Sequence, residues 1–359
     1  MEDPFAPDPS FVPLRHRAPR WPFFLAGLFL VIGATVLATW RITLPYYAVA
    51  PGPVEEVADL ITIGDVPAYT TNGDFFLLTV GLREVNAFEF LEAEFDPRVD
   101  LVGREVIRPR GVTQEEQTRT NLEAMNQSID IAVYVALTRL GYEVGFTGDG
   151  VVIRQVVEGS PAFGVLEVGD VIREVAGTRV LTADDASNVI RSRQVGESIS
   201  LAGVRGEEPL RVEITLAPHP ELEGAPMVGV VLDTVNLELD LPIDLQVDSR
   251  NIGGPSAGMM YALAVLDLLT AEDLAKGYRI AGTGTISYDE TVGAIGGVRQ
   301  KVFAARSVGA DYVLVPFDNY EEALTAAGRD IEVVAVSTLQ DALDFLDTLD
   351  PVPGSVAAS

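Results

Sequence analysis

Residues that could perform nucleophilic chemistry lie in two short segments of this 359-residue chain. The first segment, residues 251–258, is rich in glycine, contains Ser256 and leads directly into the apolar run MMYALAVLDLL. A serine at such a junction lies at the N-terminus of a predicted helix, where backbone N–H groups and the positive helix end favour a developing oxyanion. The alternative is structural, because serine is also a common N-terminal cap of helices.

A nucleophilic serine needs a base, and the chain offers few. Of its two histidines, His16 precedes a long apolar segment and His219 lies in a proline-rich joint, which disfavours a Ser-His-Asp triad but leaves His219 open as an alternative. Among the 25 basic residues only Lys276 and Lys301 are lysines. A desolvated lysine can act as a neutral base, whereas arginine stays protonated. Lys276 lies in a polar turn and is expected to be solvated, so the second segment, around Lys301, supplies the predicted base.

The composition excludes several other kinds of chemistry. Because the chain has no cysteine, we expect no disulfide, no thiol nucleophile and no cysteine-based metal site, and two histidines cannot build a multi-histidine zinc site. The 25 basic and 53 acidic residues give a formal net charge of −28, which disfavours nucleic acid as a partner. Residues 282–285 lack the length and the lysine of a phosphate-binding loop, so we expect neither ATP nor any other cofactor.

Three motifs around these residues occur in the order found in one peptidase family. They are GPSAG at residues 254–258, TGTI at residues 283–286 and IGGVRQK at residues 295–301, so that Lys301 follows Ser256 by 45 residues. Together they resemble the Lon-type (S16-like) serine peptidases over about residues 225–345. The resemblance implies a Lon-protease-like α/β catalytic domain in which Ser256 is the nucleophile and Lys301 is the general base.

The same resemblance assigns supporting roles. The hydroxyl of Thr283 is expected to orient Lys301, and the loop around the nucleophile is expected to be shaped by Gly254, Pro255 and Ala257. The family usually carries Lys-Asp before Gly-Pro-Ser, whereas Ile252 and Gly253 stand here, so loop rigidity and substrate contacts are expected to differ. The family also implies protein or peptide substrates and a homo-oligomer, a hexameric ring.

Between residues 151 and 216 the pattern changes to short strands and glycine turns with two short helices. One helix is predicted to start at Ser160-Pro161-Ala162, and the other to run from about Thr182 to Arg193. Residues 158–180, EGSPAFGVLEVGDVIREVAGTRV, resemble a PDZ domain of the bacterial protease type, which would cover about residues 141–217. The resemblance implies binding of an extended peptide as an added strand, with Gly145 and Phe146 near its carboxylate. The alternative is a PDZ-shaped spacer without a ligand.

Residues 21–40 carry no charge and have a tryptophan at each end, which predicts a helix that crosses the ~30 Å hydrocarbon core of a membrane. Three arginines precede the segment, at positions 15, 17 and 20, and only Arg41 follows it closely. The positive-inside rule then places the N-terminus in the cytoplasm and the rest of the chain outside. The alternative is a cleaved signal peptide, since Ala48-Val49-Ala50 resembles a cleavage site, but the length of the apolar run favours an uncleaved anchor.

We therefore expect an α+β chain with one N-terminal transmembrane helix, an α/β catalytic domain and a small β-rich PDZ module. Within the part before that module, FFLLTV at residues 75–80 predicts a buried strand, and a capping box at Thr113 opens a helix that Gly141 ends. The predicted segments are a disordered cytoplasmic tail (1–20), the transmembrane helix (21–41), the first part of the protease domain (42–140), the PDZ domain (141–217), the Lon-like proteolytic domain (218–349) and a disordered tail (350–359).

This order of anchor, PDZ module and Lon-type domain resembles the bacterial YlbL-like PDZ/Lon proteins. The leading hypothesis is a single-pass, membrane-anchored and ATP-independent serine endopeptidase that cleaves exported or membrane proteins selected through its PDZ domain. The alternative is a non-catalytic PDZ adaptor or regulator built on a protease-like fold. The presence of Ser256, Thr283 and Lys301 favours the enzyme.

Overall fold

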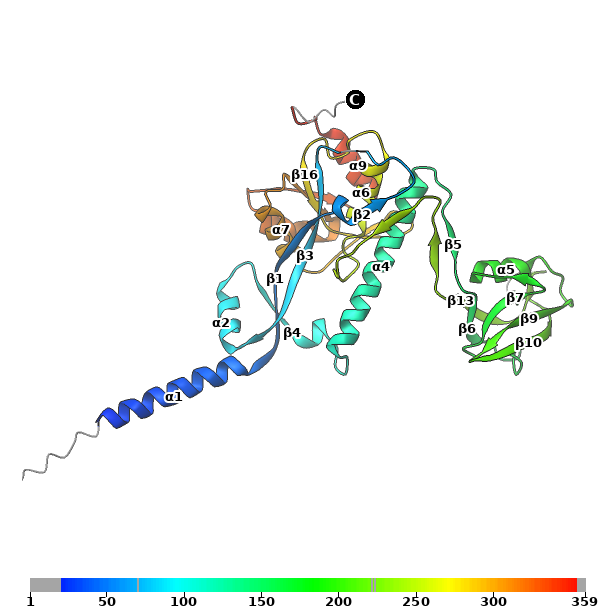
Figure 1. The fold of residues 1–359 in the computed structure, drawn as a ribbon, viewed down its shortest axis with the longest axis horizontal. Helices are drawn as coiled ribbons and strands as arrows, with labels where there is room; N and C mark the ends of the chain where they lie inside the picture. The colour runs from blue at the N-terminus through cyan, green and yellow to red at the C-terminus, as the bar shows by residue number, and fades with distance from the viewer. Residues whose placement is uncertain (1–20, 70, 221, 223, 354–359) are drawn as a thin grey trace, which may run out of the picture. The chain divides into compact units, whose positions relative to one another are not determined.

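A computed structural model describes residues 21–69, 71–220, 222 and 224–353 (Figure 1). The chain divides into two compact units: the first consists of Met1–Pro51 and Gly81–Val112, and the second of Gly52–Val80 and Thr113–Ser359. The predicted disordered tail 1–20 lies outside the described residues. The predicted tail 350–359 is described only as far as residue 353.

The first unit begins with helix α1 (Trp21–Arg41), which forms where the apolar segment predicts a helix. Its mean hydropathy reaches 2.2, its described side chains are exposed, and it is the one helix among the described residues that is long and apolar enough to cross a membrane. Residues 43–51 of strand β1 (Thr43–Glu56) follow, and β4 (Asp100–Gly103) pairs with them in antiparallel fashion. Helix α2 (Ala87–Phe95) opens with a capping box between Asn86 and Glu89, and the short α3 is Arg104–Ile107.

The second unit is built on parallel strands with helices on both faces. Its parallel strands follow the order β20-β19-β16-β3, and β3 (Asp74–Asn86) runs parallel to β16 (Arg279–Gly282) with Phe75 opposite Ile280. Successive side chains of β3 enter different cores, because Phe75 and Leu77 face one layer and Phe76 and Leu78 the other. The remaining parallel strands are β19 (Tyr312–Pro316) and β20 (Glu332–Val336).

Helices α4 (Gln114–Arg139) and α6 (Gly258–Leu269) pack against each other in the first of these layers. α6 is almost completely buried, which explains why its sequence is apolar on every face. Helices α7 (Val298–Ser307) and α8 (Tyr320–Ala327) cover the other face, and α9 (Leu339–Thr348) joins the first layer. The short elements of this unit are η1 (Ala58–Leu60), β2 (Ile61–Ile63), β15 (Leu245–Val247), β17 (Thr285–Ile286), β18 (Val292–Gly293) and η2 (Phe317–Asn319).

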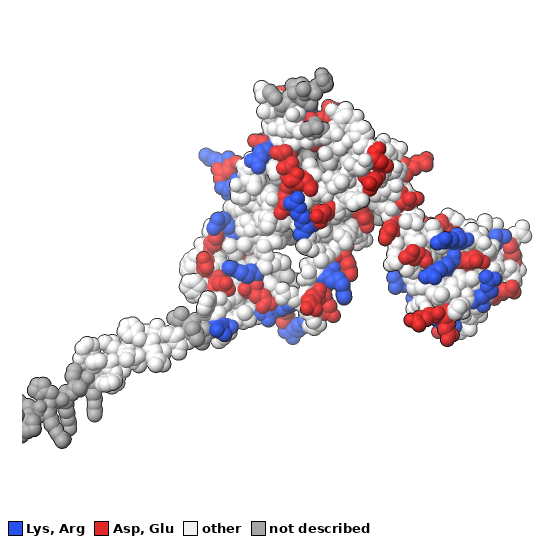
Figure 2. Space-filling view, in the orientation of Figure 1, with Lys and Arg blue, Asp and Glu red and all other residues white. Residues whose placement is uncertain are grey.

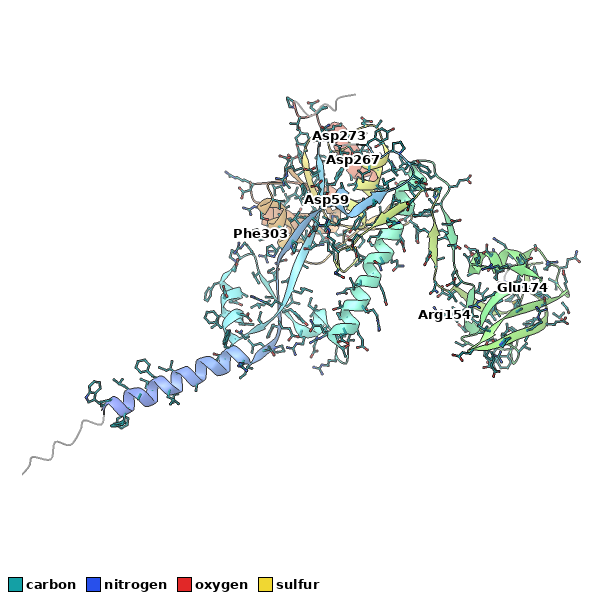
Figure 3. The ribbon with its side chains drawn as sticks, in the orientation of Figure 1. Asp59, Arg154, Glu174, Asp267, Asp273 and Phe303 are labelled. Carbon is teal, nitrogen blue, oxygen red and sulfur yellow. The ribbon has the colours of Figure 1, made fainter. Side chains whose placement is uncertain are left out.

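A β-rich module with its own core is inserted into the second unit between α4 and α6. Its sheet order is β10-β9-β7-β6-β13, and an ion pair of 2.8 Å joins Arg154 of β6 to Asp233 of β13 (Arg154 is labelled in Figure 3). The chain enters and leaves it through β5 (Gly145–Thr147) and β14 (Glu238–Asp240), which pair with each other. Its other elements are β6 (Val151–Val156), β7 (Val171–Val175), β8 (Thr178–Arg179), α5 (Ala183–Arg191), β9 (Ser198–Arg205), β10 (Glu208–Thr215), β11 (Ala217–Pro218), β12 (Pro226–Met227) and β13 (Val230–Thr234).

The prediction of a helix at Ser160-Pro161-Ala162 is wrong, because these residues form turns. Gly159 and Gly164 flank them with φ of 77° and 76°, so too few residues lie between two left-handed positions to form a helix. The other short helix is confirmed as α5, which Thr182 caps.

Two predicted boundaries also differ from the structure. Strand β13 pairs with β6, so the sheet of the module continues beyond residue 217. Residues 42–140 do not all join the catalytic core: residues 52–80 and 113–140 belong to the second unit, whereas residues 81–112 belong to the first. The predicted strand at residues 75–80 and the capping box at Thr113 are both confirmed.

Candidate active site

Ser256 lies in the loop that immediately precedes α6, and it is partly exposed. Ala257, not Ser256, occupies the N-cap position of α6, so Ser256 does not serve as the helix cap. Two contacts from α4 hold the loop: the Gly254 N–H donates to the Asn121 carbonyl at 2.7 Å, and the Ser128 hydroxyl donates to the Pro255 carbonyl at 2.8 Å. Gly254 has a φ of 92°, a left-handed conformation that glycine adopts without strain.

The amine of Lys301 donates hydrogen bonds to the Ser256 hydroxyl at 2.7 Å and to the Thr283 hydroxyl at 2.8 Å. Lys301 lies in the first turn of α7, and only 3% of it is exposed. This burial removes water from the ammonium and lowers the pKa of Lys301 to about 7. A large fraction of the side chain is therefore neutral near pH 7 and able to take a proton from Ser256.

Thr283, at the end of β16, connects the lysine to the nucleophile loop. Its hydroxyl accepts from Lys301 and donates to the backbone carbonyl of Ser256 at 3.0 Å. The N–H of Gly284 donates to the same carbonyl at 2.8 Å. These contacts fix the backbone of Ser256 on the side opposite to α4, so the loop is held between two elements that lie far apart in the sequence.

Asn319 was not singled out by the sequence analysis, yet it determines where α7 begins. The side chain is buried, its Oδ1 accepts from the Ile295 N–H at 2.9 Å, and its Nδ2 donates to the Ile295 carbonyl at 3.1 Å. Gly297 then turns the chain with a φ of 68° into the helix that carries Lys301. Asn319 therefore orients the lysine helix. The sequence signal for it is weak: Asn319 is a polar residue that follows the apolar strand β19 after only Phe317 and Asp318.

The other candidate bases lie elsewhere. His219 lies in the β-rich module, where its Nδ1 accepts from the Leu222 N–H at 3.1 Å. Lys276 is not simply solvated, because its amine donates to the backbone carbonyls of Asp347 and Leu349 at the end of α9, both at 3.0 Å. A lysine at the C-terminus of a helix is an ordinary stabilising contact. The described groups of His, Asp and Glu form no cluster that could hold a metal ion.

The β-rich module has a groove of about 370 Å³ between α5 and the edge strand β13. Apolar side chains form most of its walls, including Ile190 from α5 and Val230 and Leu232 from β13, while Arg191 and His219 lie at its border. The structure does not place Gly145 and Phe146 at this groove. They form β5 outside the module's sheet, and the ring of Phe146 stacks on Tyr134 of α4 with centroids 5.5 Å apart.

Two protein families match parts of the chain. Residues 241–346 match the family model of the Lon protease (S16) C-terminal proteolytic domain. The matched residues include Ser256, Thr283 and Lys301. The chain carries a Lon-type serine peptidase domain. Residues 135–216 match the PDZ domain family, so the β-rich module is a PDZ domain.

Curated relatives agree with this assignment over part of the chain. Lon protease 2 of Bacillus subtilis is 31% identical over 117 residues, which are 33% of this chain and 20% of that protein. The peroxisomal Lon protease homolog 2 of Caenorhabditis briggsae is 34% identical over 118 residues, which are 32% of this chain and 15% of that protein. The chain thus matches a fifth or less of the length of these relatives. Among solved structures, the PDZ domain of an SdrC-like protein from Listeria monocytogenes is 29% identical, covers 24% of this chain and 90% of its own, and has a TM-score of 0.23.

Proposed function

We propose that the protein is a membrane-anchored, ATP-independent serine endopeptidase that uses Ser256 and Lys301 as a catalytic dyad. The observation that carries the proposal is the contact of 2.7 Å between the Lys301 amine and the Ser256 hydroxyl in a site that excludes water from the lysine. A buried, neutral amine next to a serine hydroxyl is the arrangement that a Ser-Lys hydrolase requires.

The reaction follows from the positions of these groups. Neutral Lys301 removes the proton from Ser256 as its oxygen attacks the scissile carbonyl, and it later returns that proton to the leaving amine. Backbone N–H groups around the start of α6, other than that of Met259, which donates to the Gly284 carbonyl at 3.2 Å, would stabilise the oxyanion. Thr283 keeps the lysine amine in place during both steps, because its hydroxyl contacts the amine and the nucleophile loop together. The resulting acyl-enzyme would then be hydrolysed by water.

The PDZ domain would select substrates by their extended tails. Strand β13 lies at the edge of the module's sheet, so an extended peptide can add to it as a further strand. The adjoining groove would hold apolar side chains of that peptide against Ile190, Val230 and Leu232. In this proposal the carboxylate loop lies near residues 228–230, at the start of β13, and not at Gly145 and Phe146.

The anchor would be α1, with the N-terminus in the cytoplasm and both the PDZ domain and the peptidase domain outside. Its length and hydropathy support a span, and the arginines at positions 15, 17 and 20 support this orientation. Exported or membrane proteins would then be the substrates. No phosphate-binding loop motif occurs in the sequence, which supports cleavage without ATP. The proposal also includes a homo-oligomer, a hexamer by family resemblance.

The proposal can be tested with the full chain in detergent micelles, an unfolded protein substrate and no added ATP. We expect the wild type to cleave it and Ser256→Ala to be inactive. Ser287→Ala, which changes an exposed serine of the same domain, serves as the matched control and should cleave like the wild type. Equal cleavage by the wild type and Ser256→Ala would contradict the assignment of the nucleophile. If a wild type that binds substrate tails does not cleave, the adaptor hypothesis would take its place.

A further inference from the structure

Helix α2 of the first unit carries three large apolar side chains on its outward face. Phe88, Leu91 and Phe95 are spaced three and four residues apart, so they form one stripe, and their exposed fractions are 67%, 58% and 84%. The opposite face packs inward, where the ring of Phe90 meets that of Tyr46 at 5.2 Å. A helix that faces water normally places polar residues outward, so three large exposed apolar side chains on one short helix need an explanation.

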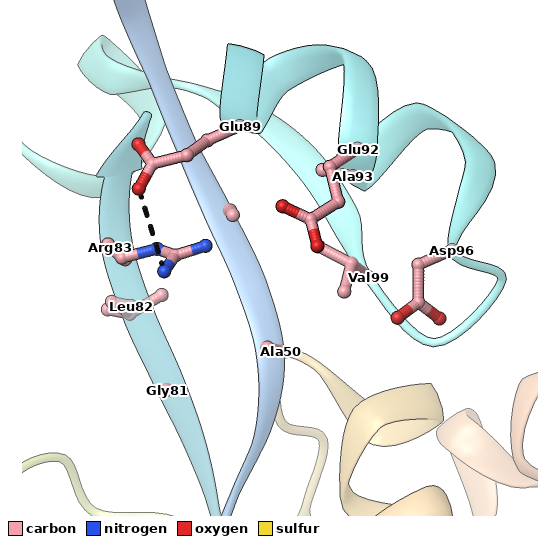
Figure 4. A pocket seen from close by; sticks show the side chains of 10 residues that line it. Ala50, Gly81, Leu82, Arg83, Glu89, Glu92, Ala93, Asp96 and Val99 are labelled. Atoms are coloured by element: carbon pink, nitrogen blue, oxygen red, sulfur yellow. Dashed lines mark ion pairs between the residues drawn. The ribbon is translucent and has the colours of Figure 1, made fainter. Parts of the chain in front are cut away.

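Acidic residues of α2 flank this stripe, since Glu92 lies four residues after Phe88 and Glu94 three residues after Leu91. Glu89 and Glu92 line a hollow of about 360 Å³ between α2 and strands β1 and β3 (Figure 4). Within it, Glu89 forms an ion pair of 3.6 Å with Arg83. Glu89 and Glu92 therefore line the hollow on one side of the helix, and Phe88, Leu91 and Phe95 form a continuous hydrocarbon surface beside it.

The position of α2 along the chain places it beside the end of α1. Only Ile42 separates α1 from β1, and residues of α2 lie with their Cα atoms within 8 Å of residues of α1. The apolar segment of α1 ends at Trp40, and a tryptophan marks the level at which a spanning helix leaves the hydrocarbon. The stripe on α2 is thus close to the depth of the lipid headgroups.

The charge of the first unit also suits a lipid surface. Residues 42–51 and 81–112 contain five arginines and seven acidic residues, which gives a net charge of −2. The second unit contains 43 acidic and 16 basic residues, which gives −27. In Figure 2, α1 carries no charged side chain along its apolar length. An anionic membrane surface would therefore repel the second unit far more strongly than the first.

We propose that the stripe formed by Phe88, Leu91 and Phe95 docks on the lipid surface of the membrane that α1 spans. The three side chains would enter the boundary between headgroups and acyl chains, at a depth of about 5–10 Å. This second attachment would prevent the first unit from turning freely about Ile42. The inference rests on the proposed anchor, and its test is designed to separate the two.

The test uses the absence of native cysteine, which allows one fluorescent label per variant of the full chain. Leu91→Cys and Phe95→Cys report on the stripe. Leu237→Cys and Phe317→Cys are the controls, because these residues of the second unit are similarly exposed, at 51% and 66%. Leu28→Cys reports on α1 itself. Each labelled protein is reconstituted into phosphatidylcholine vesicles, with and without phosphatidylcholine that carries a quencher on its acyl chain.

We expect quenching at positions 28, 91 and 95 to be several-fold stronger than at positions 237 and 317. It should persist at high salt, because the contact is apolar rather than ionic. Quenching at position 28 without quenching at 91 and 95 would overturn the docking face and leave the anchor intact. Self-quenching between labels at 91 or 95, without quenching by lipid, would overturn lipid as the occupant in favour of a second copy of the chain. Absence of quenching at position 28 would instead refute the anchor.

Discussion

The chemistry at Ser256 depends on how four side chains are fixed to one another. Lys301 approaches from the first turn of α7, Thr283 from the end of β16, and Ser128 holds the nucleophile loop from α4. In the proposed mechanism, none of these residues needs to move for the proton to pass from Ser256 to Lys301, since the two heteroatoms are already 2.7 Å apart. Pre-organisation of this kind lowers the barrier because the reacting groups do not have to be ordered during the reaction.

Asn319→Ala should slow cleavage by a factor on the order of 10 to 100, because Ile295, in the segment that leads into α7, loses its two hydrogen bonds to Asn319 and the lysine is displaced. Looser packing would also admit water to Lys301 and raise its pKa, so the inflection of the pH–rate profile should move to higher pH. The rate and the inflection are both measured on the folded protein.

The control for this prediction is Asn86→Ala. Asn86 is also a buried asparagine, but it caps α2 in the first unit, so its loss should cost about 1 kcal/mol of stability. It should leave the inflection in place. If Asn319→Ala behaves in the same way, Asn319 has only a structural role.

The sequence was sufficient to bring Ser256, Thr283 and Lys301 together, because each belongs to a motif with a recognisable spacing. It was not sufficient for Asn319 or Ser128. Their roles depend on hydrogen bonds to backbone atoms 24 and 127 residues away, and backbone atoms have the same chemistry in every residue type. The sequence therefore contains no local signal for such contacts.

Among the elements, α6 combines the nucleophile loop at its start with an unusual buried acid near its end. Asp267, which is labelled in Figure 3, is 3% exposed, and its carboxylate accepts from the Leu274 N–H at 2.8 Å. Burial raises the pKa of Asp267 to about 7. The hydrogen bond from the Leu274 N–H lowers this pKa, but its effect is smaller than that of burial. The folded state thus disfavours the charged carboxylate, and its penalty grows as the pH rises from about 4 to about 7.

Asp267→Asn should therefore stabilise the protein at pH 8 by an amount on the order of a few kcal/mol, and the gain should vanish near pH 4, where the carboxyl is protonated in both states. Asparagine keeps the acceptor for the Leu274 N–H. Urea unfolding at several pH values measures the effect.

Asp289→Asn is the control of opposite sign. The hydrogen bond from the Thr291 N–H lowers the pKa of Asp289, so removing this charge should not stabilise the protein at pH 8. A pH-independent effect of Asp267→Asn would contradict the assignment of the raised pKa.

Local sequence signals predicted helices well where the capping residues lie in the same segment as the helix. Thr113 with Glu116 and Thr182 with Asp185 form capping boxes, and α4 and α5 begin at those positions. The errors concern non-local pairing. Strand β13 joins the PDZ sheet by pairing with β6, about 80 residues earlier, and β5, which contains Gly145 and Phe146, pairs with β14 outside that sheet. Strand partners of this kind are set by the whole core, which no short pattern encodes.

At the scale of the whole molecule, substrate selection is proposed for the PDZ domain and peptide-bond cleavage for the peptidase domain. The chain enters and leaves the PDZ domain at adjacent points, since backbone hydrogen bonds of 2.9 Å join Asp149 to Val235 and Val235 to Gly150. Replacing residues 150–234 with a short glycine linker should therefore preserve the peptidase domain. We expect the acylation rate of Ser256 by a small probe to stay close to that of the wild type, while cleavage of a protein substrate falls.

The two rates are measured on the same preparation. The Gly229 carbonyl accepts from the Val157 N–H, so the N–H of Val230 points away from β6 toward the free edge of β13. Val230→Pro, which removes that donor, should reproduce the loss of protein cleavage without a deletion. If the deletion instead increases protein cleavage, the PDZ domain is an inhibitory lid and not a receptor for substrates.

The central claim is that Lys301 acts as the base for Ser256, and its most direct test is the acylation rate of Ser256 as a function of pH in the wild type and in Lys301→Arg. Since the pKa of Lys301 is lowered to about 7, the wild-type rate should rise with pH through about 7 and level off once the amine is neutral. Arginine keeps the positive charge but cannot be deprotonated, so Lys301→Arg should fold and react on the order of 10²–10⁴ times more slowly, with no such inflection. A folded Lys301→Arg variant that reacts at nearly the wild-type rate would contradict the dyad.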